Sequence, residues 1–216
     1  MAGDVKGPAK PASRRERARA TRLRITRAAH RLFVGRGYAG TRMADVAEEA
    51  GVAVQSVYFT FHTKVELLQA CYELAVMGEE DPLPPPEQPW FKAIFEAPTG
   101  PEALAHFAGG FGQIAARVAV LDDVVRAAMH EPEAVAVRAN SEALRRDGYR
   151  AVAASLAGRF GLRAGLDVDR ATDLLLVLAG SATYRQLVVD YGWDRDGFLA
   201  WLTASLAELV LAAGGE

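Results

Sequence analysis

The sequence predicts an all-α protein made of a small basic N-terminal module and a larger acidic helical bundle. Apolar residues recur at intervals of three and four along most segments, and period-two alternation is scarce. Residues 1–64 carry 13 Lys/Arg against 5 Asp/Glu, a balance of +8, whereas residues 65–216 carry 12 against 22, a balance of −10. This asymmetry indicates a module for a polyanion, although a solvated basic face would have the same composition.

The N-terminal module is predicted to contain three helices behind a flexible tail, residues 1–12. The helices are expected over residues 14–35, 41–50 and 53–60. Ser13 and Glu16 have the spacing of a capping box at the start of the first helix, Thr41 is a good N-cap for the second, and Gly51 supplies the next turn. The last two helices would form a helix-turn-helix over about residues 41–60.

The rest of the chain, residues 65–216, is predicted to be a helical bundle. Thr63 and Glu66 form a second capping box, which starts a helix through Met77, and the proline-rich stretch 79–90 is expected to be a loop. Further helices are expected over about 99–118, 121–129, 132–160, 167–179, 181–191 and 194–211. Glycines 109, 110 and 112 either let another helix approach closely or leave room beside a ligand.

A motif in the N-terminal module points to a known family. Its positions are Gly37-Tyr38, Thr41, Asp45-Val46-Ala47, Ala50-Gly51-Val52, Val57-Tyr58, Phe61, Lys64 and Leu67-Leu68. In these residues the chain resembles the tetracycline-repressor-like (TetR) family of transcriptional regulators, over about residues 14–70. The resemblance implies a helix-turn-helix DNA-binding domain, residues 13–64, and an all-helical ligand-sensing and dimerisation domain, residues 65–216.

Several residues of the module have the chemistry of DNA contacts. The expected set is Arg22, Thr41, Arg42, Val54, Gln55, Ser56, Tyr58, Thr60 and Lys64. Gln55 can bond bidentately to an adenine edge, and Val54 can contact a thymine methyl. Lys64, at the first turn of a helix, and the hydroxyl of Tyr58 are expected to meet phosphates. The family often has Ser or Thr where Ala53 stands, so the reading helix lacks its usual side-chain cap.

The arginines at 14, 15, 17, 19 and 22 are expected to add sequence-independent attraction to DNA. The first few could lie along the minor groove as an extended arm. The capping box at Ser13 favours the alternative, in which they are already helical.

An effector site is predicted in the middle of the bundle, where helices carry aromatic and polar residues together. The candidates are Phe107, Phe111, Met129, His130 and Tyr149, with plain core packing as the alternative. No nucleophile elbow, P-loop, paired carboxylates or metal-ligand spacing occurs, so we expect neither an enzyme nor a cofactor or metal. Cys71 is the one cysteine, which excludes an internal disulfide.

The last helix has one broad apolar face, which predicts burial against a second subunit. The expected interface residues are Leu187, Phe198, Trp201, Leu202, Leu206 and Leu209. The resemblance implies a four-helix bundle formed by segments 167–191 and 194–211 of two subunits. The expected protein is a cytoplasmic homodimeric repressor without a membrane partner, released from a pseudo-palindromic operator by an apolar or aromatic effector. Two alternatives are a helical protein-interaction adaptor and a helical enzyme or binding protein that merely contains a helix-turn-helix-like element.

Overall fold

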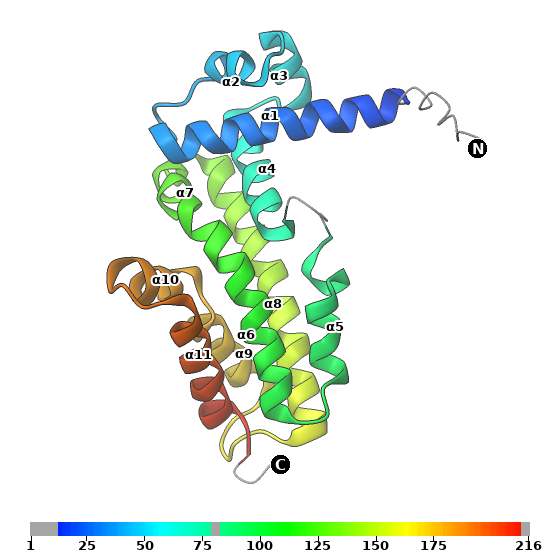
Figure 1. The fold of residues 1–216 in the computed structure, drawn as a ribbon, viewed down its shortest axis with the longest axis vertical. Coiled ribbons are helices and arrows are strands. Elements are labelled where there is room, and N and C mark those ends of the chain that lie inside the picture. Colours follow the sequence, from blue (N-terminus) through cyan, green and yellow to red (C-terminus); the bar gives the residue numbers. More distant parts are fainter. Residues whose placement is uncertain (1–12, 79–82, 213–216) are drawn as a thin grey trace, which may run out of the picture.

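The computed structural model of the chain describes residues 13–78 and 83–212 (Figure 1). Within these ranges all regular structure is helical apart from one isolated bridge between Leu162 and Leu211, which confirms the predicted all-α class. The predicted tail, residues 1–12, lies outside the described residues. A small head, with one long helix across the top and two short ones above it, sits at one end of a long body whose main helices run along the long axis (Figure 1).

The first helix of the head begins directly after the predicted cap, Ser13. It contains α1 (Arg14–Arg36), α2 (Met43–Ala50) and α3 (Val54–Thr60). The Ser13 hydroxyl accepts from the Glu16 amide at 3.2 Å, and the Glu16 carboxylate accepts from the Ser13 amide at 2.5 Å, so the capping box is confirmed. Gly51 joins α2 to α3 with φ 63°, in the left-handed region that favours glycine.

The body is built around two long helices. It contains α4 (Lys64–Met77), η1 (Pro85–Glu87), α5 (Pro89–Glu96), α6 (Gly100–Val118), η2 (Ala119–Leu121), α7 (Asp122–Ala128), α8 (Pro132–Phe160), α9 (Val168–Leu178), α10 (Ser181–Tyr184), η3 (Arg185–Asp190) and α11 (Arg195–Val210). Side-chain caps begin four of them, at Thr63, Thr99, Asp167 and Asp194. The helices α5 and α11 flank α6 and α8 on opposite sides (Figure 1).

Two predicted boundaries were wrong. Thr41 does not cap α2, because its hydroxyl donates to the Gly37 carbonyl at 2.9 Å, and α2 starts two residues later, at Met43. The predicted loop over 79–90 ends early, because Pro89 opens α5. Proline fits this position since the first amides of a helix have no partner inside the helix.

The buried side chains form two cores, and the head core extends beyond the predicted head. It includes α4 as far as Ala75, together with Leu121 and Ala134 from the upper end of the body. A second core fills the space between α5, α6, α8, α9 and α11. The helix α4 is therefore packed as part of the head, although it leads down into the body (Figure 1).

Two of the three α6 glycines serve close packing. A Cβ on Gly110 would collide with the indole of Trp90, and one on Gly112 would lie 2.6 Å from Cδ2 of Leu199. Gly109 has open space beside it. Of the two predicted roles, close helix packing is correct for Gly110 and Gly112. These two glycines do not leave room for a ligand.

One helical span, Gly100–Ala128, is long and apolar enough by composition to cross a membrane, with a mean hydropathy of 1.3. Half of the tested window is buried inside the molecule. It contributes Leu104 and Phe107 to the body core and Leu121 to the head core, which is the environment of a core helix.

Candidate nucleic-acid interface

The helix α3 turns an uncharged face to solvent, on the side of the head away from the body (Figure 1). Val57 is fully buried and anchors the helix, whereas Val54 is 38% exposed, Tyr58 is 51% exposed and Gln55 is also exposed. Ala53 stands at the N-cap without a side-chain hydrogen bond, which confirms the predicted missing cap. Side chains of this kind, on a helix that stands clear of the body, can enter a groove of DNA.

Arg22 and Thr60, both expected to contact DNA, hold α3 against α1. Nη1 of Arg22 donates to the Thr60 carbonyl at 3.3 Å, and the guanidinium lies 4.2 Å from the centre of the Phe61 ring. The Thr60 hydroxyl donates to the Ser56 carbonyl at 2.8 Å. The structure thus gives both residues a positioning role, and Arg22 stays exposed, so its contact with DNA remains a prediction.

Lys64 and Thr41 are likewise used inside the head. Nζ of Lys64 donates to the Tyr38 carbonyl at 3.0 Å and lies 4.0 Å from the centre of the Tyr38 ring. Thr41 is 1% exposed, so its hydroxyl cannot reach a phosphate. The expectation of free phosphate contacts missed these partners because they come from the loop between α1 and α2.

The other expected contacts remain accessible. Arg42 is exposed at the start of α2, and Ser56 is half-buried on α3. The exposed arginines of α1 are Arg14, Arg15, Arg17, Arg19, Arg22, Arg24, Arg31 and Arg36. The chain is helical from Arg14 onward, so these arginines lie on a helix and do not form the extended arm that was the other alternative. The N-terminal half of α1 projects past α4, where it can lie along a polyanion (Figure 1).

The head is fastened to the body by a contact that the sequence did not reveal. The hydroxyl of Tyr38 donates to the carboxylate of Glu131, just before α8, at 2.9 Å, and the ring packs edge-on to His130. Burial, reinforced by Glu131, raises the pKa of Tyr38 above its ordinary value, so the phenol stays a donor at neutral pH. The two residues are 93 positions apart, so no local pattern could have paired them.

The predicted effector residues do not line one cavity. Phe107 and Phe111 are 1% and 6% exposed in the body core, and Phe107 meets the Tyr149 ring edge-on at 4.9 Å. The Tyr149 hydroxyl donates to the Ala179 carbonyl at 3.1 Å. Met129 is half-buried at the end of α7, and His130 is exposed at the contact between head and body. The prediction is corrected: Phe107, Phe111 and Tyr149 are core packing, and Met129 and His130 lie elsewhere.

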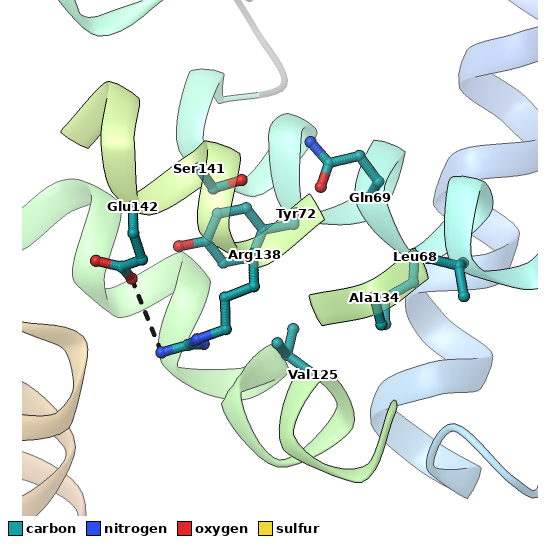
Figure 2. A pocket seen from close by; sticks show the side chains of 9 residues that line it. Leu68, Gln69, Tyr72, Val125, Ala134, Arg138, Ser141 and Glu142 are labelled. Atoms are coloured by element: carbon teal, nitrogen blue, oxygen red, sulfur yellow. Dashed lines mark ion pairs between the residues drawn. The ribbon is translucent and has the colours of Figure 1, made fainter. Parts of the chain in front are cut away.

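A narrow crevice lies between α4, α7 and α8, just below the head (Figure 2). Its volume is about 30 Å³, room for roughly one water molecule. The lining residues are Val65, Leu68, Gln69, Tyr72, Val125, Ala134, Arg138, Ser141 and Glu142. Arg138 and Glu142 form an ion pair at 3.8 Å (Figure 2), and burial raises the pKa of Tyr72, which keeps its phenol protonated. The crevice combines an apolar wall with a few hydrogen-bonding groups.

The residues predicted for a dimer interface fall into two groups. Phe198, Leu202 and Leu206 are 0% exposed, because they point into the core of their own subunit. That part of the prediction is corrected, since these side chains cannot also face a partner. The predicted residues that stay at least partly accessible are Leu187, Trp201 and Leu209.

The family model that matches this chain covers the head and the start of the body only. Residues 25–71 match the family model described as bacterial regulatory proteins, tetR family. The HTH-type transcriptional regulator TtgR and the probable HTH-type transcriptional regulator ArpR, both of Pseudomonas putida, are each 48% identical over 56 residues. That match spans 26% of this chain and 27% of the length of each relative.

Solved structures match nearly the whole chain, at low identity. Native NalD, the secondary repressor of the MexAB-OprM multidrug efflux pump in Pseudomonas aeruginosa, superposes with a TM-score of 0.69 at 18% identity, over 91% of this chain and 98% of that one. FadR from Bacillus subtilis, in complex with stearoyl-CoA, gives 0.68 at 17% identity, over 85% and 96%. These likenesses show the fold alone: a helix-turn-helix domain followed by a helical C-terminal domain.

Proposed function

We propose, from the premise that the chain belongs to the tetR family of bacterial regulatory proteins, that it is a homodimeric repressor of transcription released by a small molecule. The observation that carries the proposal is the exposed, uncharged face of α3 beside the exposed arginines of α1. Arginines supply sequence-independent attraction, whereas uncharged side chains in the major groove discriminate base edges. The family is one of regulators, in agreement with the prediction that the chain is not an enzyme.

Within the proposed interface, Gln55 and Val54 read bases and Tyr58 reaches a phosphate. Gln55 has the paired donor and acceptor that match an adenine edge, and Val54 offers an apolar contact for a thymine methyl. Arg22 holds the reading helix against α1 through Thr60 and Phe61, and Lys64 holds the start of α4 against the loop before α2 through Tyr38.

The proposed dimer uses the outer face of α9, η3 and α11. Apolar side chains exposed there include Val177 at 66%, Val189 at 62%, Tyr191 at 64% and Leu209 at 39%. The two-fold arrangement of a homodimer would cover this face and set two α3 helices about one DNA turn, ~34 Å, apart. The operator would then be a pseudo-palindrome, and the protein would act in the cytoplasm, where the DNA is.

We place the effector at the crevice between α4, α7 and α8. A drug-sized ligand needs roughly 300 Å³ or more, so an effector has to part α4 from α8 in order to enter. Because α4 packs into the head core, this opening moves the head relative to the body. An effector that binds only the opened form must weaken DNA binding, and DNA must reciprocally weaken effector binding. The lining favours a small apolar or aromatic molecule with one or two hydrogen-bonding groups.

The test is to bind the purified protein to DNA from upstream of its own gene and to a random-sequence duplex of equal length. A regulator should prefer a defined site by ~10³-fold or more. A protein-interaction adaptor or a helical enzyme would show no such preference, so equal binding to both duplexes would reject the proposal.

A further inference from the structure

Phe59 is the most exposed of the large apolar side chains that the structure describes. It is 86% exposed on α3, at the position four residues after Gln55, and therefore lies on the same face of the helix. Within residues 13–78 and 83–212 no aromatic ring packs against it, and no cation lies over it. The fold does not need this phenyl ring.

A lone exposed apolar residue is common and by itself means little. The position of Phe59 is what distinguishes it, because its neighbours on the exposed face are Val54, Gln55 and Tyr58. Val57, on the opposite side, is 0% exposed and holds the helix against the head core. Phe59 thus points to solvent from a helix that Val57 holds against the head core.

The chemistry of the ring limits what it can recognise. A phenyl group has no hydrogen-bond donor or acceptor and no charge, so it cannot bind a phosphate or the polar edge of a base. The C5-methyl of thymine is the apolar group that the bases present in the major groove. Phe59 is therefore matched to thymine, next to the base that Gln55 reads.

We propose that Phe59 is a specificity-determining residue that selects thymine through its C5-methyl, once in each half of the operator. The proposal rests on the proposed function, since it needs α3 to lie in the major groove. Removing the methyl from the DNA should have the same effect as removing the ring from the protein. A methyl group transferred from water to an apolar contact is worth ~0.8 kcal/mol, which is about fourfold in affinity for each half-site.

The experiment starts from the preferred duplex, selected from a random pool with the full-length protein. Each thymine is then replaced by deoxyuridine, symmetrically in both half-sites, because deoxyuridine pairs identically but lacks the methyl. Wild type should lose about 15-fold in affinity at one thymine of each half-site, two fourfold effects combined. With Phe59→Ala this difference between thymine and uracil should vanish at that position. Val54→Ala, whose proposed thymine contact lies at another position, should keep the difference at the thymine that faces Phe59.

The outcomes separate this proposal from the one on which it rests. If the selection finds no preferred sequence, the proposed function fails and this proposal falls with it. If a preferred sequence emerges but uracil has no effect at any thymine, or has the same effect on Phe59→Ala as on wild type, the role of Phe59 alone is overturned. The thermal unfolding midpoint of Phe59→Ala should match wild type, because the ring is not packed, so a loss of affinity cannot be ascribed to misfolding.

Discussion

The head and the body of this protein differ in how strictly their structure constrains the sequence. The family model matches residues 25–71, and 56 residues of the chain are 48% identical to TtgR, whereas the likeness to NalD over nearly the whole chain comes with 18% identity. In the head, individual polar side chains fix how the helices pack, as Arg22 does at Phe61 and Lys64 at Tyr38. The body mainly packs apolar faces, and many sequences can meet that requirement. Specific chemistry is therefore concentrated in the head, and the proposed role of the body is to control where the head lies.

The largest expected effect concerns the charge of the head. If a dimer neutralises roughly 6 to 10 phosphates, its affinity for DNA should drop ~10³- to 10⁵-fold between 50 and 200 mM salt, because binding releases counterions from the DNA. The measurement is a titration of the operator at a series of salt concentrations. An affinity that is independent of salt would show that the arginines of α1 do not meet the backbone.

The next effect concerns the outer face of the body. Val177→Glu should give a monomer that loses ~10²- to 10⁴-fold in operator affinity, because a buried unpaired charge opposes the interface and the two heads are no longer linked. Light scattering and operator titration measure the two effects.

Leu144→Glu is the matched control for this face. Leu144 is also 66% exposed, and it lies two residues before Arg146, which pairs with Asp173 of α9. Residues two apart on a helix point to different sides, so Leu144 faces away from α9. Dimers that persist in Val177→Glu, or dissociate equally in Leu144→Glu, would be incompatible with the proposed interface.

A smaller effect is expected at the crevice. Ala134→Phe should push α4 away from α8 and weaken operator binding without any effector, because overpacking costs about 1–3 kcal/mol, or roughly 5- to 150-fold if it acts wholly on the DNA-binding form. Ala136→Phe, at an exposed position on the same helix, should bind like wild type. Equal operator affinities for the two variants would mean that the crevice is not coupled to the head.

The smallest effect is expected at the contact between head and body. Tyr38→Phe keeps the ring under Lys64 but removes the hydrogen bond to Glu131, so the free energy of unfolding should fall by ~0.5–1.5 kcal/mol. Denaturant titration measures this loss. If stability is unchanged, the hydrogen bond does not fasten the head.

The helices of this fold could be predicted from the sequence because their signals are local. Ser13, Thr63 and Asp194 cap the helices expected of them, since a cap and its amide partner lie three residues apart. The uses of Arg22 and Lys64 could not be predicted, because their partners lie 38 and 26 residues away and depend on how the helices pack.

The last helix shows the same limit. Its apolar residues at intervals of three and four form one broad face in the sequence, but the structure turns Phe198 and Leu202 into the body core and leaves Leu209 partly exposed. Periodicity reveals that a face is buried, not what buries it. The body core and a proposed second subunit share that face.

The central claim is that the uncharged face of α3 reads DNA sequence, and Gln55→Ala tests it most directly. Its affinity should be measured on the preferred operator and on an unrelated duplex at one salt concentration. Loss of the proposed base contact should cost ~1–3 kcal/mol on the operator and almost nothing on the unrelated duplex, since backbone contacts are unchanged. An equal loss on both duplexes, or no loss on either, would contradict it.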